Sequence, residues 1–395
     1  MRPHPTLLAR GFALVLCALV VGGVGVILCR APVRGPVAPP VLAPPEPTAR
    51  PAPPPAPPPA PPPAPPPAPV VSAPPEPVDE PPPRTLGEQR AALFRTLATQ
   101  LDFSPEQVAA MRAIVEASRF IGQGNPAISH HAMSPAGCRA VRAAAGKAPR
   151  EALRPPCDRL NMVPVYDPGA GQTAADAPVC IDQFEFPDIA CVYPVVFPTA
   201  REAALLCAAA GKRICDAHEW EGACAGALHP PEVEYEFGKP RPYATWLHNK
   251  HREIVWAYGP KKDHSRCATG AVKSASCAGG GYETCGSHTW PAGAFPGCVS
   301  PLGVYDQHGN AAEHMNLPLA PAELAGRGGT GATEMKGSWF VFARQEAHED
   351  DCRWRAKDWH PSALMAEDSH RNYHLGFRCC KDVTASTSAP DPAAP

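Results

Sequence analysis

The sequence predicts one large disulfide-rich domain that a proline-rich stalk joins to an N-terminal apolar segment. Of the 395 residues, 55 are proline, and more than half of the prolines fall in residues 1–84. Fourteen of the 16 cysteines come after the apolar segment. Roughly 300 residues follow the proline tract, which is enough to bury the core of one domain. The net charge of −2 gives no indication of a nucleic-acid partner.

Residues 1–30 are expected to form a membrane anchor or a signal. Residues 11–29, GFALVLCALVVGGVGVILC, carry no charge and follow two arginines. A helix of this length would be about 28 Å long, close to the hydrocarbon thickness of a bilayer. The apolar region of a cleaved signal peptide is usually shorter, so an uncleaved anchor is favoured. A lipoprotein is disfavoured, because Leu28 precedes Cys29 where a small residue is usual.

Residues 31–84 are expected to form an extended stalk. Proline fixes φ and removes the amide donor, so the Ala-Pro-Pro-Pro repeats cannot form a helix or a sheet. At about 3.1 Å per residue the stalk would be on the order of 150 Å long. A docking site for a proline-binding module is the alternative, and a spacer is preferred. Residues 384–395 are expected to be a disordered tail.

The even number of cysteines beyond the apolar segment predicts a disulfide framework. Structural zinc is the competing interpretation, but zinc sites usually use close pairs such as C-x2-C, and only Cys379 and Cys380 come near that spacing. Disulfides persist in oxidising compartments. We therefore expect an inner-membrane anchor with the ectodomain in the periplasm or outside the cell. The cysteines are Cys138, Cys157, Cys180, Cys191, Cys207, Cys215, Cys224, Cys267, Cys277, Cys285, Cys298, Cys352, Cys379 and Cys380.

Residues 85–122 are expected to form a pair of helices that pack together. LGEQRAALFRTLATQLDF is amphipathic, and Ser104-Pro105-Glu106-Gln107 has the capping pattern that begins a second helix. Residues 123–176 show little periodicity and contain Cys138 and Cys157. We expect this stretch to be an irregular extension that disulfides tie to the main domain.

The main domain is expected to span residues 177–383. Thr199 and Glu202 have the spacing of a capping box, so they predict a helix that ends near Gly211. Asp216 and Glu219 repeat this pattern and predict a second short helix. Capping therefore explains both acidic residues without any catalytic chemistry.

Four motifs then resemble the formylglycine-generating enzymes, also called sulfatase-modifying factors. GKRICDAHEWEGACAG, from Gly211, resembles the Gly-Lys-Arg-Leu-Pro-Thr-Glu-Ala-Glu-Trp-Glu motif of that family. Residues 303–313, 336–339 and 375–379 resemble its Gly-Leu-Tyr-Asp-x-x-Gly-Asn-x-Trp-Glu, Gly-Gly-Ser-Trp and Gly-Phe-Arg-Cys motifs, in the same order. The resemblance implies an α+β fold, an irregular variant of the C-type-lectin fold with little regular secondary structure.

The resemblance also implies part of the disulfide pairing. The spacing of Cys207 and Cys224 matches two structural disulfide cysteines of the family, and Cys379 matches the distant partner of Cys207. The partner of Cys224 stays open between Cys215 and Cys352. The cysteines of this domain assigned to disulfides are Cys180, Cys191, Cys207, Cys215, Cys224, Cys352 and Cys379.

Copper is the cofactor that the resemblance implies for the active oxidases. In those enzymes two cysteines hold Cu(I), two and seven residues after the aromatic residue of Gly-Gly-Ser-Trp. Counted from Trp339, these positions are Val341 and Glu346, and neither offers a soft ligand. Cys352 could supply one thiolate at most. We therefore expect no copper and no catalytic residue.

Calcium is the other metal that the resemblance implies. The family binds it through Gly-Asn-x-Trp-Glu, so the expected ligands here are Gly309, Asn310, Ala311 and Glu313. The alternative is a plain turn capped by Asn310. A second calcium site of the family is not expected, because Cys267 stands where that site needs asparagine.

Histidines give a weaker indication of metal binding. His308, Glu313 and His314 resemble a zinc site only loosely, because they do not form His-Glu-x-x-His. His248 and His251 are expected to be surface residues.

The sequence therefore favours a membrane-tethered protein that acts in binding or assembly, with an unidentified protein or small molecule as its ligand. The alternative is an oxidase of the family that converts cysteine to formylglycine or catalyses a related oxidation. No nucleophile triad, phosphate loop or paired-carboxylate motif indicates another enzyme class.

Overall fold

The computed structural model describes residues 81–148, 153–357 and 362–384. The apolar segment, most of the stalk and residues 385–395 lie outside this range, so the expectations for them stay predictions. Within the described residues, no helix has both the length and the apolar character needed to cross a bilayer.

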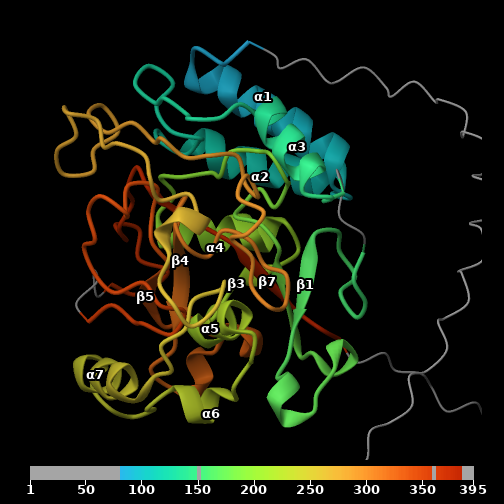
Figure 1. The fold of residues 1–395 in the computed structure, drawn as a ribbon, viewed down its shortest axis with the longest axis vertical. Coiled ribbons are helices and arrows are strands. Elements are labelled where there is room, and N and C mark those ends of the chain that lie inside the picture. The colour runs from blue at the N-terminus through green and yellow to red at the C-terminus, as the bar shows by residue number, and fades with distance from the viewer. Residues whose placement is uncertain (1–80, 149–152, 358–361, 385–395) are drawn as a thin grey trace, which may run out of the picture. The chain divides into compact units, whose positions relative to one another are not determined.

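Helices begin the described chain, strands end it, and the two are mixed between (Figure 1). The α-helices are α1 (Leu86–Gln100), α2 (Pro105–Ala117), α3 (Pro135–Ala144), α4 (Ala200–Ala209), α5 (Ala217–Ala225), α6 (Pro231–Glu234) and α7 (Arg241–His251). The strands are β1 (Met162–Val165), β2 (Val179–Asp182), β3 (Arg213–Ile214), β4 (Ala312–Leu317), β5 (Ala332–Lys336), β6 (Leu375–Phe377) and β7 (Cys379–Asp382). The 3-10 helices are η1 (Pro168–Ala170), η2 (Ala174–Asp176), η3 (His264–Arg266), η4 (Pro321–Glu323) and η5 (Ala325–Arg327).

Two small sheets form the centre of the domain. The first has the strand order β1-β2-β7-β3 and is antiparallel throughout. The second has the order β5-β4-β6, in which β4 pairs antiparallel with β5 and parallel with β6. Only Arg378 separates β6 from β7, so the chain passes directly from one sheet to the other. The predicted disulfide-rich α+β fold with short elements is confirmed.

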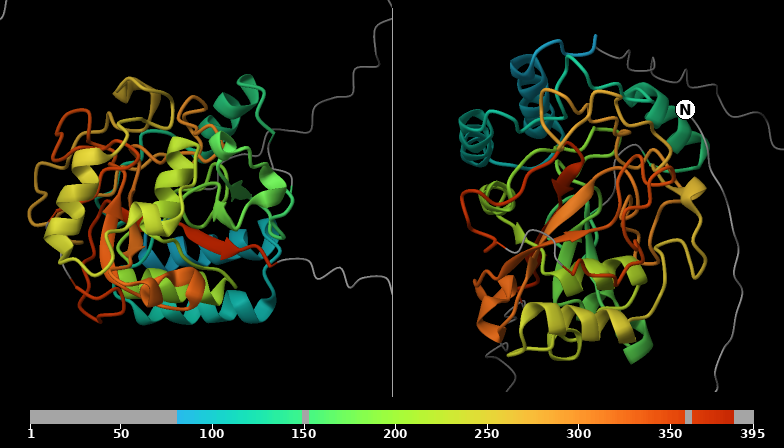
Figure 2. Two further views of the ribbon diagram at one scale, coloured as in Figure 1. Left: turned by 90° about the horizontal axis from the view of Figure 1, so that it is seen from below. Right: turned by 90° about the vertical axis from the view of Figure 1, so that its left-hand side faces the viewer.

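The helix pair α1 and α2 packs on the main domain at the end remote from α6 and α7 (Figures 1 and 2). Thr85 and Ser104 begin the two helices, each in a capping box, as the sequence predicts for Ser104. Phe94 and Leu97 of α1 join Met111 of α2 in one hydrophobic cluster, which also contains residues of α4. The pair therefore adds to the core, as expected.

The stretch 123–176 is less irregular than its weak periodicity suggests. It forms α3, and its strand β1 pairs with β2 at the edge of the first sheet. Disulfides Cys138–Cys191 and Cys157–Cys180 connect it to the main domain. The strand was missed because MVPV is short and buried at every position, so it lacks the alternation that marks a half-buried strand.

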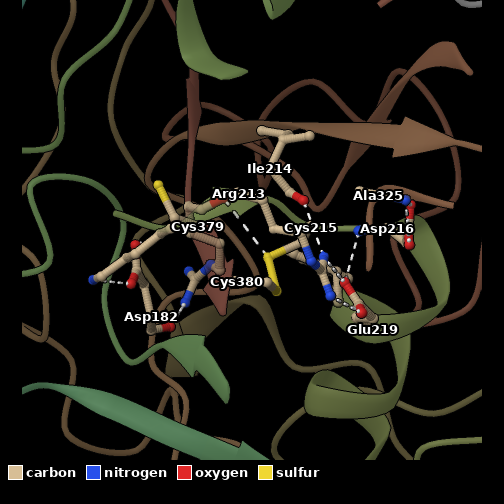
Figure 3. Close-up of a disulfide and its surroundings, with 12 residues drawn as sticks. Asp182, Arg213, Ile214, Cys215, Asp216, Glu219, Ala325, Cys379 and Cys380 are labelled. Atoms are coloured by element: carbon tan, nitrogen blue, oxygen red, sulfur yellow. Dashed lines mark hydrogen bonds and ion pairs between the residues drawn. A yellow bond between two sulfur atoms is a disulfide. The ribbon is translucent and has the colours of Figure 1, made fainter. Parts of the chain in front are cut away.

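All fourteen cysteines of the described residues form disulfides. The remaining pairs are Cys207–Cys379, Cys215–Cys380, Cys224–Cys352, Cys267–Cys298 and Cys277–Cys285. The expected Cys207–Cys379 bridge is confirmed. Of the two partners left open for Cys224, Cys352 is the one found, and the Cys215–Cys224 alternative is wrong because Cys215 bonds to Cys380 (Figure 3).

The motif that begins at Gly211 is therefore scaffold. Arg213 binds the carboxylate of Glu219 with two hydrogen bonds of 2.8 and 2.6 Å, and Glu219 also accepts from the backbone N–H of Asp216 (Figure 3). Cys215 and Cys224, on either side of Asp216 and Glu219, tie the motif to the C-terminal part of the chain. Glu219 caps the start of α5, as the sequence predicts, and its pairing with Arg213 is a contact that the sequence analysis did not predict.

Disulfides that close long loops should contribute most to stability. The double variant Cys207→Ser, Cys379→Ser opens a bridge between residues 172 apart, whereas Cys277→Ser, Cys285→Ser opens one between residues only 8 apart. Loop entropy predicts that the first variant loses about 2–3 kcal/mol more free energy of unfolding than the second. Urea unfolding midpoints measure this difference. Equal midpoints for the two variants would contradict the prediction.

Candidate functional site

The candidate calcium motif lies in the turn that leads into β4. Gly309 and Asn310 both have positive φ angles, of 76° and 56°. A Cβ atom on Gly309 would lie 2.6 Å from the carbonyl oxygen of Ala268, so the backbone approach requires glycine. The turn therefore has a fixed shape.

The buried side chains of Asn310 and Glu185 stabilise this turn by hydrogen bonds. Asn310 Oδ1 accepts from the backbone N–H of Trp290 at 2.8 Å, and its Nδ2 donates to Glu185 Oε2 at 2.7 Å. The other oxygen of Glu185 accepts from the N–H of Ala311 at 2.8 Å. Complete burial raises the pKa of Glu185 well above its ordinary value, with smaller contributions from Asp306 and Glu313.

Glu313 is held in a buried ion pair. Both of its carboxylate oxygens accept from Arg378, at 2.6 Å each, and Oε2 also accepts from Trp220 Nε1 at 2.8 Å. A calcium ion needs oxygens that are free to coordinate it. Here the side-chain oxygens of Asn310 and Glu313 already accept from N–H groups. The side chains of the motif therefore do not fit the ion, and their arrangement matches the alternative of a turn capped by Asn310.

The two positions that correspond to the copper cysteines differ in their exposure to solvent and in their contacts. Val341 is buried, with 1% of its surface exposed. The Glu346 side chain is half exposed, and its oxygens lie 2.6 Å from His264 Nε2 and 2.9 Å from Lys262 Nζ. Neither position supplies sulfur. The nearest cysteine along the chain, Cys352, is bonded to Cys224.

A chain of polar contacts runs from this surface pair to the buried Ser338. Lys262 Nζ lies 3.6 Å from Asp350 Oδ1, which also accepts from Trp256 Nε1 at 3.0 Å. Ser338 Oγ donates to Asp350 Oδ2 at 3.2 Å and accepts from the N–H of Gly309 at 2.9 Å. Ser338 is completely buried, so its hydroxyl orients neighbours and is not placed to attack a substrate.

The loose zinc grouping does not form. His308 Nε2 accepts from the N–H of Ala257 at 3.0 Å and lies 3.4 Å from Cys224 Sγ, beside the Cys224–Cys352 disulfide. His314 Nε2 instead donates to the carbonyl of Pro198 at 3.1 Å. Burial lowers the pKa of His308 to about 4, so its imidazole is neutral at pH 7.

A family model for the sulfatase-modifying factor enzyme 1-like domain matches residues 177–383, more than half of the chain. The chain belongs to the sulfatase-modifying factor family. No curated protein matches the chain closely enough to be named as a relative. The matched range coincides with the main domain expected from the four motifs.

Polar contacts between side chains join the four family motifs to one another. Trp220 from the first motif and Arg378 from the last both bind Glu313 of the second, and Lys336 of the third pairs with Glu221 of the first at 3.0 Å. In this sulfatase-modifying factor domain, the motif residues therefore cross-link the fold.

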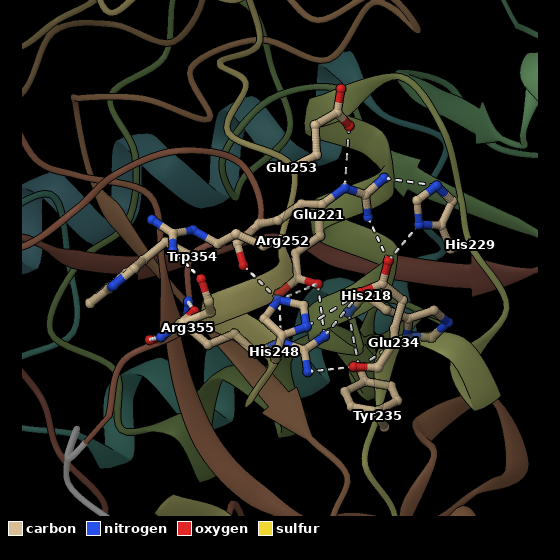
Figure 4. A network of polar contacts seen from close by, with 12 residues as sticks. His218, Glu221, His229, Glu234, Tyr235, His248, Arg252, Glu253, Trp354 and Arg355 are labelled. Carbon is tan, nitrogen blue, oxygen red and sulfur yellow. Dashed lines mark hydrogen bonds and ion pairs between the residues drawn. The ribbon is translucent and has the colours of Figure 1, made fainter. Parts of the chain in front are cut away.

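Glu221 of the first motif is also part of a buried charge network that the sequence did not reveal (Figure 4). Glu221 accepts from Arg355 at 2.8 Å through both oxygens, and Glu234 accepts from Arg353 at 2.7 Å. These two carboxylates and His248 lie close enough together to hold a metal ion. The guanidinium groups of Arg353 and Arg355, however, already bind the carboxylate oxygens. The partners are up to 134 residues apart, so no local motif could indicate them.

His248 corrects one of our expectations. Its side chain is only 7% exposed and donates from Nε2 to the carbonyl of Arg353 at 2.7 Å, so it is not a surface residue. His251, one turn further along α7, is exposed as expected. The error arose because an isolated helix pattern does not show which face the distant residues 353–355 will cover.

Removal of the Glu313 charge should destabilise the domain. Glu313→Gln removes the carboxylate that binds the buried Arg378 through two hydrogen bonds, which costs about 3–5 kcal/mol of unfolding free energy. The control Glu346→Gln removes a half-exposed carboxylate and should cost at most about 1 kcal/mol. We also expect millimolar calcium to leave the melting temperature of the wild type unchanged. A calcium-dependent rise that Glu313→Gln abolishes would show that the motif binds the ion.

His248 should make the domain less stable in mild acid. Burial, followed by the charge of Arg355, lowers its pKa to about 3. When the pH falls below about 6.5, histidine in the unfolded chain takes up a proton and folded His248 does not, so stability decreases by up to about 1.4 kcal/mol per pH unit from this residue. His248→Gln should flatten the dependence of the urea midpoint on pH between about 6.5 and 3. His251→Gln is the control and should leave the wild-type slope unchanged.

Proposed function

We propose that this protein is a membrane-tethered, extracytoplasmic member of its family that acts in binding or assembly and lacks the copper oxidase reaction. One observation carries the proposal: every cysteine of the described residues is bonded to another, and the two copper positions hold Val341 and Glu346. Cu(I) in proteins is held by soft thiolate or thioether ligands. Neither Val341 nor Glu346 supplies such a ligand.

The surroundings of the two positions support this proposal. Val341 packs in a hydrophobic cluster with Phe340 and Phe342, so this position serves the core. Glu346 pairs with Lys262 and His264, and the hard oxygen ligands of a carboxylate do not favour Cu(I). Release of Cys352 would require the opening of a bridge to Cys224, whose sulfur is completely buried.

Sequence and disulfides together support the tethered, exported location. The uncharged residues 11–29 are long enough for an anchor, and the proline tract separates them from the domain. Seven bridges within the described residues are typical of an oxidising compartment.

A copper and peptide assay on the purified full chain tests the proposal. The wild type should neither bind Cu(I) tightly nor convert a Cys-x-Pro-x-Arg peptide to the aldehyde, with or without added copper. The double variant Val341→Cys, Glu346→Cys restores the thiolate pair and should gain tight Cu(I) binding, whereas each single variant should not. Disulfide mapping of the variants confirms that the native bridges are retained.

Formylglycine formation by the wild type would contradict the proposal and favour the alternative of an active oxidase. If that activity disappeared in Cys352→Ser, Cys352 would be a catalytic thiol rather than a structural one.

A further inference from the structure

A groove of about 370 Å³ has no contribution from Ser338, Val341 or Glu346 and is not used by the proposed function. It lies between the N-terminal end of α5, the loop from α5 to α6, η5 and the end of β7. Its walls include four apolar side chains and two basic ones, namely Pro178, Leu228, Pro230, Leu324, His218 and Arg327.

His218 presents a hydrogen-bond donor to this groove. The residue is 6% exposed, and its Nδ1 lies 3.0 Å from the hydroxyl of Tyr235, which also accepts from the His218 backbone N–H. Burial raises the pKa of Tyr235 well above its ordinary value, so the hydroxyl keeps its proton and donates it to Nδ1. The ring proton is then on Nε2, which has no hydrogen-bond partner among the residues that the structure describes.

The acidic residues of the groove already have ion-pair or hydrogen-bond partners. Arg213 lies between Glu219 and Asp382, at 2.6 and 2.5 Å. Asp216 accepts from Asn316 Nδ2 at 2.6 Å and from the N–H of Ala325 (Figure 3). Arg327, by contrast, has a side chain that is 54% exposed, and its nearest carboxylate, Glu232, lies 3.5 Å away on the surface.

The donors that face an occupant are therefore His218 and Arg327. They fit a segment with small apolar side chains, hydrogen-bond acceptors and a negative charge.

The chain itself supplies such a segment at the wall of the groove. Strand β7 ends at Asp382, which lines the groove, and the N–H of Val383 donates to the carbonyl of Pro178 on the same wall. Residues 385–395, ASTSAPDPAAP, then follow, with Ala, Ser, Thr and Pro and one acidic side chain, Asp391. Asp391 is seven positions after Thr384, an extended reach of about 22 Å.

We propose that the groove binds residues 385–395 of the same chain, with Asp391 at Arg327 and a backbone carbonyl accepting from His218 Nε2. Alanine and proline side chains then contact Leu228, Pro230 and Leu324. The tail thus covers the groove and would compete with any other proline-containing peptide for it.

Photo-crosslinking in the full chain tests this proposal. Benzoylphenylalanine in place of Ala389 should form links to the peptides that contain residues 228–231 or 324–327, as mapped by mass spectrometry. The same probe in place of Ala73 is the control for non-specific links. Arg327→Asp and Asp391→Arg should each reduce the yield to the level of this control, and the two together should restore it, because the charge pair is reversed. His218→Phe keeps the ring but removes the donor, and should also reduce the yield.

Two outcomes would overturn the proposal. One is a yield at position 389 no higher than that of the control probe, or links to another part of the surface. The other is that, in a mixture of isotope-labelled and unlabelled chains, the links join one chain to another, which would make the occupant a second copy. Arg327 is largely exposed, so its replacement tests the contact without disturbing the core.

Discussion

The fold depends on one buried side chain, the guanidinium of Arg378. It lies between β6 of one sheet and β7 of the other, and it is completely inaccessible to solvent. It binds Glu313 of β4 through two oxygens and donates to the carbonyls of Asp182 and Tyr305. A buried ion without such partners would cost several kcal/mol, so the position of each partner is constrained by the others. The two sheets are therefore joined by charge as well as by the backbone.

This constraint also decides what the family motifs can do in this chain. Glu313, Asn310 and Ser338 carry the polar groups that could hold a metal or orient a substrate. Each of them already makes two or more hydrogen bonds inside the domain. These polar groups thus rigidify the scaffold in this chain.

The sequence predicted those features whose causes are local. Ser104, Thr199 and Asp216 mark helix starts because a cap acts over three residues. The Cys207–Cys379 bridge was predictable only through the family resemblance. The Cys215–Cys380 bridge and the pairing of Glu221 with Arg355 join residues more than 130 positions apart. Such pairs depend on how the sheets assemble, and no spacing in a single sequence encodes them. The groove was missed for the same reason, since six separate segments form its walls.

The adjacent cysteines of β7 have a consequence for how the chain reaches its folded state. Neighbouring residues of a strand point to opposite faces, and accordingly Cys379 joins the cluster around α4 whereas Cys380 joins the one around α5. Their partners, Cys207 and Cys215, emerge about 170 residues earlier during synthesis. Until β7 arrives, these two thiols have no native partner and lie close in sequence to Cys224. Correct pairing therefore has to wait for the last strand, so the chain is open to disulfide exchange, and to the enzymes that catalyse it, for most of its maturation.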